Sequence, residues 1–497
     1  MIGLGIILKH YYHNMKTEFE PFVKDFVRDL LDNNVAIFAG AGMSKAAGYV
    51  NWKELLSDIA YDLKLNIERE TDLISLAQFH VNENNNRHKI NTKILDEFIE
   101  GSTFTENHKI LSRLPITTFW TTNYDCLIEK SLEDNQKRVA KKFKETHLSN
   151  SIYKKDCIVY KMHGDVSEPN DAVITKEDYE QYYLKRGLFT SALNGDLITK
   201  TFLFIGFSFS DPNISYILSR LNNQIEKRSS RQHYCFIKKP EIGQEDINNQ
   251  AELDYANIKQ NLVINDLKRY NIKALLIDDY LEITEVLKEI EKRYKKQTIF
   301  ISGSSCGEYG RFSSPDAQEF IHNLIKNIIS DGYAIVNGFG VGVGSAVING
   351  ALDAIDANPK KCSDDQLIMK PFPQFATSEK SILELWEAYR KRIIPLAGIA
   401  IFIFGNKKDS TNDTTIFADG VLKEFNIAIE NGLIPIPIAT TGYMSKHIFN
   451  LIIASPEAYY LQEHVWIVDL LKKMDSDSIS QGDIIKSVIS IIKKINK

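Results

Sequence analysis

A glycine-rich turn near the start of the sequence has the residue types needed to hold a phosphate group. Residues 38–44 read FAGAGMS and overlap the end of the short apolar run 35–39, which favours a buried strand. Glycine lets a backbone approach an anion closely, and the amide groups at a helix start attract the anion. The pattern alone is a weak indication, because the third glycine of the dinucleotide fingerprint is absent after Gly42. A tight turn without a ligand therefore stays an open alternative.

Three further polar segments each follow a run of residues that is typical of a strand. They are TTNYD at 121–125, HGD at 163–165 and GFSFSDP at 206–212. The carboxyl ends of parallel strands lie at one edge of a sheet, where ligands bind, so we expect these segments to share a site with the glycine turn. Simpler roles stay open for single residues. Asn123 could cap a helix, His163 could be a buried structural histidine, and Asp211 could cap a helix that starts at Pro212.

The elements that must position these segments alternate between helices and strands. Apolar residues at helical spacing predict helices at 19–33, 51–64, 71–81, 88–100 and 126–133. Runs of β-branched and aromatic residues predict strands at 35–39, 116–122, 157–162, 201–205, 233–237 and 273–277. This alternation predicts an α/β fold with a mostly parallel sheet.

A charged amphipathic helix is predicted over 281–297, and the pattern then restarts. The second half is predicted to contain a strand at 298–304, a helix at 315–330, a strand at 333–336, a glycine-rich loop at 338–344, a strand at 399–404 and a helix at 419–431. We therefore expect an N-terminal extension over 1–16, one domain over 17–292 and a second over 293–497. The apolar run 1–8 is too short to span a membrane and lacks the flanks of a signal peptide. An alternative is that translation starts at Met15.

Composition excludes several classes of protein. Of the 497 residues, 43% are hydrophobic and 25% are charged, as in ordinary globular chains. The net charge of -5 gives no reason to expect nucleic acid as a partner. The five cysteines form no Cys-x-x-Cys pair, so we expect neither a disulfide framework nor a zinc site. We expect a cytoplasmic location and no membrane segment.

The motifs GAGMS, TTNYD, KMHGD and GFSFSDP resemble the SIR2-like NAD-binding family over roughly residues 17–290. The resemblance implies a Rossmann-type parallel sheet with helical insertions. It implies that the NAD phosphate loop is formed by Gly40, Ala41, Gly42 and Ser44. It places Asn123 and Asp125 beside the nicotinamide ribose and makes His163 the general base. The adenosine side would be held by Gly206 and Ser208.

Two departures from the family concern its protein-deacylating members. Those enzymes carry an Asp-Phe-Arg segment where this chain reads Tyr49-Val50-Asn51-Trp52, and they carry a four-cysteine zinc module that is missing here. The resemblance therefore implies cleavage of NAD+ at the nicotinamide bond, through an oxocarbenium-like ribosyl cation. His163 would accept a proton from water or a ribose hydroxyl, Asn123 would hold water or the carboxamide, and Asp125 would orient the ribose or the nicotinamide.

A second glycine-rich segment occurs in the C-terminal half. Residues 333–350 read YAIVNGFGVGVGSAVING, which suits phosphate binding at a helix start, although a packing turn is an open alternative. The candidate residues are Gly338, Gly340, Gly342, Gly344 and Ser345. With Arg390-Lys391 and Glu424 further on, this order resembles the SLOG nucleotide-binding superfamily. The resemblance implies a Rossmann-like α/β domain.

The C-terminal half departs from the hydrolases of that superfamily at one loop. Their Pro-Gly-Gly segment is replaced by Phe404-Gly405-Asn406, which argues against hydrolysis in this half. Arg390 and Lys407 stay suitable as phosphate partners, and Glu424 as an acceptor for ribose hydroxyls. Solvated charges on helix faces are the alternative for each.

A SIR2-like domain followed by a SLOG domain resembles the effector family of the Thoeris anti-phage systems. The resemblance implies an NAD+ glycohydrolase that depletes NAD+ in abortive defence. It implies activation by a cyclic ADP-ribose isomer, made by a TIR-domain partner protein and bound by the SLOG domain. It also implies a homotetramer that uses NAD+ as substrate and no metal. The alternatives are an NAD-dependent protein deacylase and a non-catalytic scaffold that senses NAD or another nucleotide.

Overall fold

The computed structural model describes residues 16–99, 102–150, 152–209, 211–224, 231–244, 247–376, 379–409, 411 and 413–497. The apolar run 1–8, the alternative start at Met15 and nearly all of the expected N-terminal extension lie outside the described residues. The described residues divide into two compact units, one that ends at Glu291 and one that covers Lys292–Lys497. The boundary falls within helix α14 (Leu281–Lys295).

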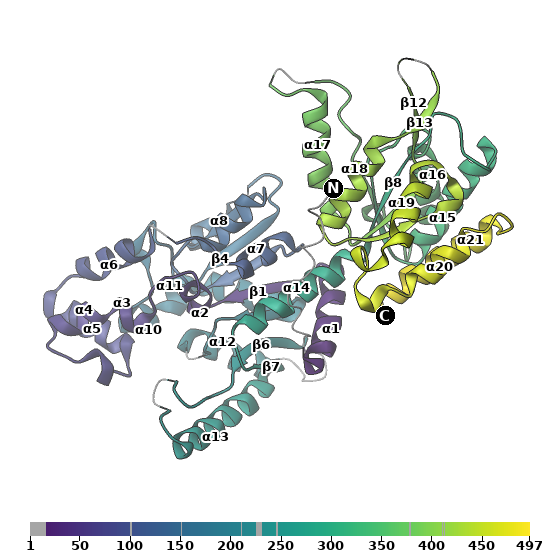
Figure 1. The fold of residues 1–497 in the computed structure, drawn as a ribbon. Coiled ribbons are helices and arrows are strands. Elements are labelled where there is room, and N and C mark those ends of the chain that lie inside the picture. The colour runs from purple at the N-terminus through teal and green to yellow at the C-terminus, as the bar shows by residue number, and fades with distance from the viewer. Residues whose placement is uncertain are drawn as a thin grey trace. The chain divides into compact units, whose positions relative to one another are not determined.

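The N-terminal unit is built on a seven-stranded parallel sheet with the order β3-β4-β2-β1-β5-β6-β7 (Figure 1). Its strands are β1 (Val35–Ala39), β2 (Thr118–Thr121), β3 (Val139–Lys142), β4 (Cys157–Lys161), β5 (Thr201–Ile205), β6 (His233–Lys238) and β7 (Ile272–Ile277). β1 and β5 are buried along their whole length, as expected for central strands covered on both faces. The predicted strands are confirmed, and β3 is one that the sequence pattern missed.

Helices flank this sheet and extend beyond it. They are α1 (Glu20–Leu31), α2 (Ala41–Lys45), α3 (Trp52–Leu55), α4 (Ser57–Asp62), α5 (Leu73–Asn84), α6 (His88–Phe98), α7 (Glu106–Arg113), α8 (Leu127–Asp134), α9 (Glu145–Ser149), α10 (Lys176–Glu180), α11 (Tyr182–Thr199), α12 (Pro212–Gln224) and α13 (Gln250–Leu267). Helices α3 to α6 gather at one end of the unit in Figure 1 and share a core around Ile59 and Leu76. These are the helical insertions that the sequence predicted.

The C-terminal unit has a five-stranded parallel sheet with the order β10-β9-β8-β11-β14. Its strands are β8 (Thr298–Ser304), β9 (Ala334–Asn337), β10 (Leu367–Met369), β11 (Ile399–Phe404) and β14 (Ile434–Pro437), and a separate antiparallel hairpin joins β12 (Asn406–Lys408) to β13 (Thr415–Phe417). The predicted α/β class with two Rossmann-like parallel sheets is confirmed for both units. β10 and β14 were not predicted, and both are edge strands.

Seven helices of eight or more residues surround the second sheet in the described chain after α14. They are α15 (Ser314–Ser330), α16 (Gly344–Ala357), α17 (Ile382–Ile393), α18 (Asp419–Glu430), α19 (Tyr443–Ala454), α20 (Ile467–Met474) and α21 (Gln481–Ile495). β8 and β11 form the centre of a core that includes buried Ile301 and Phe402. Among the described residues, no helix combines the length and apolar character that crossing a membrane requires.

Candidate functional site

The first glycine turn packs directly against the loop that follows β5. The amide of Gly40 donates to the carbonyl of Ile205 at 2.9 Å, and the amide of Gly42 donates to that of Gly206 at 2.9 Å. A Cβ atom on Gly206, whose φ is +64°, would lie 2.3 Å from the amide nitrogen of Met43. Close packing of two loops therefore requires these glycines, and two of the amides expected to face a phosphate are engaged within the fold.

Four predicted site residues form one hydrogen-bonded network at the ends of β1 and β2. The Nδ2 group of Asn123 donates to the Ser44 hydroxyl at 2.8 Å and to the Gly40 carbonyl at 3.0 Å. The Ser44 hydroxyl donates to the Asp125 carboxylate at 2.6 Å, and both Ser44 and Asp125 are buried. The network holds a neutral amide and a carboxylate at the carboxyl edge of the sheet, where the sequence predicted a shared site.

Asp125 also starts the helix that follows the turn. Its second carboxylate oxygen accepts the amide of Leu127 at 3.0 Å, at the beginning of α8. The amide of Asn123 donates to the Thr121 hydroxyl at 3.0 Å, which fixes the start of the turn. The turn is thus held both by its own local hydrogen bonds and by contacts with the glycine turn of β1.

His163 follows β4, the strand that pairs with β2, and it is 2% exposed. Its Nε2 atom lies 3.2 Å from the carboxylate of Asp211. The angles do not satisfy a hydrogen bond, so Nε2 has no hydrogen-bond partner among the described residues. The rings of Tyr179 and Tyr182 lie edge-on to the imidazole, with centroids 5.6 and 6.3 Å away. A buried imidazole beside a carboxylate is suited to accept a proton and to be stabilised afterwards.

Asp211 lies beside His163, a contact that the sequence did not predict. Its carboxylate caps α12 by accepting the amide of Ile214 at 3.1 Å, which confirms the cap, and it also accepts the hydroxyl of Tyr179 at 3.2 Å. Burial raises the pKa of Asp211, but His163 and these hydrogen bonds outweigh it and lower the pKa below its ordinary value. Asp211 therefore remains ionised beside the histidine.

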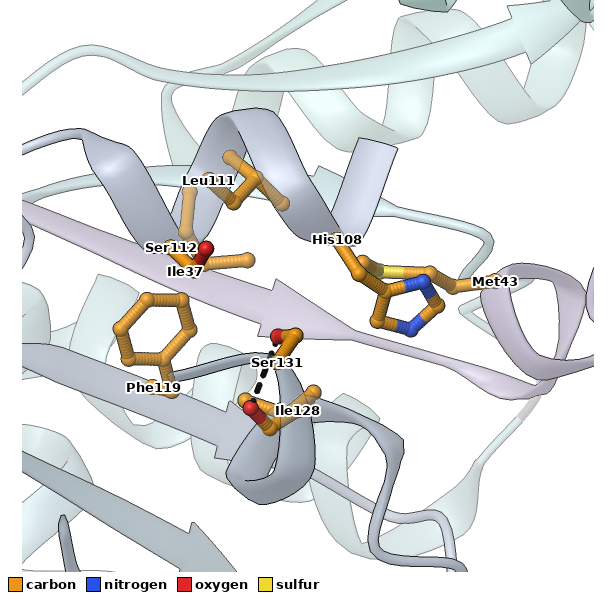
Figure 2. A pocket seen from close by; sticks show the side chains of 8 residues that line it. All are labelled: Ile37, Met43, His108, Leu111, Ser112, Phe119, Ile128 and Ser131. Atoms are coloured by element: carbon orange, nitrogen blue, oxygen red, sulfur yellow. Dashed lines mark hydrogen bonds between the residues drawn. The ribbon is translucent and has the colours of Figure 1, made fainter. Parts of the chain in front are cut away.

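The other predicted residues of this half lie around the same loops. Ala41 is exposed at the first position of α2, and Ser208 is exposed on the loop after β5 that carries Gly206. Beneath the turn, a narrow apolar pocket lies between β1, β2, α7 and α8, and Figure 2 shows the His108 imidazole beside Met43 in it. This pocket is separate from the polar network.

In the C-terminal unit, a buried carboxylate lies at the centre of the predicted ligand edge. The Ser302 hydroxyl on β8 donates to one oxygen of Glu424 at 2.6 Å, and the Nε group of Arg390 donates to the other at 3.3 Å. The Arg390 guanidinium also lies 5.0 Å from the centroid of the Phe372 ring. Burial raises the pKa of Glu424, and the contacts with Ser302 and Arg390 oppose that rise. The structure thus brings Arg390 and Glu424 together, and Ser302 was not predicted.

The second glycine loop is also closely packed. A Cβ atom on Gly340 would lie 2.0 Å from the Gly303 carbonyl, and one on Gly338 would lie 2.3 Å from the Phe372 ring. Gly342 has a φ of +70°, while Gly344 begins α16 and is followed by an exposed Ser345. The loop therefore follows β9 and lies against the end of β8.

Lys407 is placed differently from the other predicted residues. It is exposed on β12 and pairs with Asp419 at the start of α18, apart from the Arg390–Glu424 pair. Its neighbour Asn406 is buried, accepts the amide of Cys306 at 2.9 Å and donates to the carbonyl of Glu308 at 2.8 Å. The segment that replaces Pro-Gly-Gly thus anchors a hairpin to the loop after β8.

Comparison with known families defines the class of protein. The SIR2-like domain family matches residues 117–260, and the Sir2- and TIR-associating SLOG family matches residues 282–495. The chain is 45% identical over 475 residues to NAD(+) hydrolase ThsA of Bacillus cereus (strain MSX-D12), covering 95% of this chain and 98% of that protein. It is 43% identical over 473 residues to NAD(+) hydrolase ThsA of Acinetobacter baumannii (strain 532279), covering 94% and 97%. It is 46% identical over 453 residues to NAD(+) hydrolase ThsA of Cytobacillus dafuensis, covering 90% of each.

The chain therefore combines a SIR2-like domain with a SLOG domain. It belongs to the ThsA family of NAD(+) hydrolases. The predicted resemblance to this family is confirmed.

Proposed function

We propose that the N-terminal unit hydrolyses NAD+ to ADP-ribose and nicotinamide. The observation that carries this proposal is the Asn123–Ser44–Asp125 network, which lies at the ends of β1 and β2 while His163 follows the adjacent strand β4. Such an edge of a parallel sheet is where a dinucleotide binds. Membership of a family whose members are named NAD(+) hydrolases supports the same activity.

The residues have distinct roles in the proposed reaction. The C–N bond between ribose and nicotinamide breaks with its electron pair going to nicotinamide, which leaves as a neutral molecule and needs no acid. Asn123 holds water or the carboxamide without adding charge. Asp125 orients the ribose or the nicotinamide. Water then adds to the ribosyl cation while the His163 imidazole takes its proton.

Asp211 assists His163 as the proton acceptor in this proposal. Its carboxylate lies 3.2 Å from Nε2 of His163, on the side of the imidazole where it can match a positive charge. Once His163 has accepted a proton, the same carboxylate stabilises the imidazolium. Tyr179 fixes the carboxylate by donating a hydrogen bond. The glycine turn, Gly206 and Ser208 would line the phosphate and adenosine parts of NAD+.

We further propose that the C-terminal unit binds a cyclic ADP-ribose isomer, made by a TIR-domain partner protein, and that this ligand activates NAD+ hydrolysis in abortive anti-phage defence. Arg390 would face a phosphate, Glu424 would accept from ribose hydroxyls, and the loop from Gly338 to Ser345 would approach the pyrophosphate. Lys407 remains in the proposal as a second phosphate partner, which would have to leave Asp419. A cytoplasmic homotetramer is part of the same proposal.

Activation requires that the ligand bind two states of the chain with different affinity. The test is nicotinamide release from NAD+, measured with no ligand and with each of several cyclic ADP-ribose isomers. We expect release that one isomer strongly increases. If the protein binds intact NAD+ but releases no nicotinamide under any condition, the scaffold alternative is supported instead. NAD-dependent loss of acyl groups from a peptide would support the deacylase alternative.

A further inference from the structure

A buried lysine lies directly beneath the turn that carries Asn123 and Asp125. Lys161 is the last residue of β4, is 0% exposed, and stands in register with Thr121 at the end of β2. Removing an ammonium group from water is strongly unfavourable unless its N–H groups find acceptors and its charge is matched. The contacts of Lys161 therefore indicate which part of the structure it stabilises.

The ammonium group of Lys161 binds the backbone of the turn and two carboxylates. Nζ donates to the carbonyl of Tyr124 at 2.9 Å and to the carbonyl of Asp125. It lies 2.6 Å from the carboxylate of Asp165 and 3.4 Å from that of Glu129. Burial lowers the pKa of Lys161, but the two carboxylates outweigh burial and raise the pKa above its ordinary value. Lys161 is thus a charged group with an acceptor for each of its N–H bonds.

The same cluster is poorly suited to a metal ion. Cys126, Glu129 and Asp165 have ligand atoms within 4.8 Å of one another. However, the Lys161 ammonium already pairs with Asp165, and burial raises the pKa of Glu129 and raises that of the Cys126 thiol to about 11. The carboxylates therefore stabilise the positive charge of Lys161, and the Lys161 ammonium donates hydrogen bonds to the backbone of the turn.

The two carbonyls that Lys161 binds belong to the residues that follow Asn123. On its other side the turn is held by side-chain hydrogen bonds among Asn123, Asp125 and Ser44. The carbonyl of Tyr124 accepts the amide of Val166 as well, at 3.0 Å. Rotation of either peptide would move the amide of Asn123 or the carboxylate of Asp125 away from the ribose. Lys161 opposes that rotation.

We propose that Lys161 is a positioning residue for NAD+ cleavage, acting through the 123–125 turn. This inference rests on the proposed function, in which Asn123 and Asp125 contact the nicotinamide and its ribose. Misplacement of reacting groups by about 1 Å lowers a rate by about 100-fold. Loss of Lys161 is therefore expected to lower kcat and to leave binding of the ADP-ribose portion unchanged, because that portion contacts the other loops.

The test compares Lys161→Met with Lys141→Met in the full chain. Lys141 binds the other oxygen of Asp165 at 2.9 Å and is partly exposed, but it has no hydrogen bond to the turn. The two variants therefore remove one positive charge each from the same carboxylate, and Lys161→Met alone frees the carbonyls. Thermal unfolding checks that each variant is folded. If Lys161→Met fails to fold, Lys161→Gln replaces it, because its amide keeps N–H donors for the carbonyls without the charge.

Three quantities are measured for each protein: kcat, KM for NAD+, and the Kd of ADP-ribose by calorimetry. We expect Lys161→Met to lower kcat by about 100-fold, with KM and the Kd of ADP-ribose within about threefold of the wild type, and Lys141→Met to keep all three. Lys161→Gln should lower kcat by about tenfold. Equal losses in the two lysine variants, an unchanged kcat, or a loss seen mainly in ADP-ribose binding would each overturn the inference. Absence of nicotinamide release by the wild-type chain would overturn the proposed function itself, and with it this role.

Discussion

Two buried histidines should make the N-terminal unit sensitive to mild acid. The Nδ1 atom of His108 accepts the amide of Thr105 at 3.2 Å, and Nδ1 of His233 accepts the amide of Phe202 at 3.1 Å. Burial lowers the pKa of His108 from 6.5 to about 4, against a smaller opposing effect of Asp125. Burial lowers the pKa of His233 to about 4 as well. Both imidazoles are therefore neutral acceptors in the folded state.

The sign and size of the effect follow from proton linkage. Between the folded pKa and the unfolded value near 6.5, the unfolded chain binds more protons, so the free energy of unfolding falls as the pH falls. Each histidine should remove about 2 kcal/mol between pH 7 and pH 5, and about 3 kcal/mol in total by pH 4. The two together amount to about 4 kcal/mol at pH 5, which is a large part of the stability of a domain.

The variant His108→Gln separates this effect from a general loss of stability. His108 is the third residue of α7 and completes a capping box with Thr105. Glutamine is a usual residue at this position of a capping box, so the variant keeps the cap and removes the titration. Hydrogen exchange in peptides of α7 and α8, corrected for intrinsic rates, reports the free energy of unfolding of this unit alone. We expect the loss between pH 7 and pH 5 to fall by about half in the variant.

A suitable control is His322→Gln on α15 of the other unit, where the histidine is partly exposed and pairs with Asp353 at 2.9 Å. It should leave the pH dependence of α7 and α8 unchanged. The reasoning is refuted if His108→Gln keeps the full wild-type loss of stability between the two pH values.

Three further substitutions test other contacts. Asp211→Asn keeps a cap for α12 but removes the carboxylate beside the histidine, so kcat should fall by about 10- to 100-fold without loss of fold, measured by nicotinamide release and thermal unfolding. Gly206→Ala should abolish activity and lower the free energy of unfolding of the N-terminal unit by about 2 kcal/mol or more, measured by denaturant unfolding. Gly243→Ala is its control, because Gly243 also has a positive φ but has open space around it, and it should lower the free energy of unfolding by about 1 kcal/mol. Arg390→Ala should abolish activation by the cyclic nucleotide and spare basal turnover, while its exposed neighbour Lys391→Ala should do neither.

The strands that position the first site could be predicted because each is a locally readable run of buried residues. Their carboxyl ends then place Asn123 and His163 at one edge, since β2 and β4 pair in parallel. β3 escaped prediction because two of its four residues are lysines, and β14 because IPIP contains two prolines. Both are edge strands, where local propensity and the final structure agree least well.

Contacts between distant segments could not be predicted in the same way. The sequence marks Asp211 as a helix cap, and only the fold brings its carboxylate to His163. The glycine pattern predicts a phosphate-binding loop, yet the amide of Gly40 donates to the last residue of β5 and that of Gly42 donates to the loop after it, contacts that depend on the neighbouring strand. Likewise Lys407 lies near Arg390 in the expected motif order, and a hairpin turns it toward Asp419.

The two units use similar sheet edges with opposite chemical arrangements. In the N-terminal unit, the carboxylate of Asp211 stands 3.2 Å from the imidazole of His163, a side-chain type suited to proton transfer. In the C-terminal unit, Glu424 binds Ser302 through one oxygen and Arg390 through the other. A carboxylate held at both oxygens is fixed in orientation, which suits recognition of a hydrogen-bond donor on a ligand. This difference supports the proposed catalysis in the first unit and the proposed ligand recognition in the second.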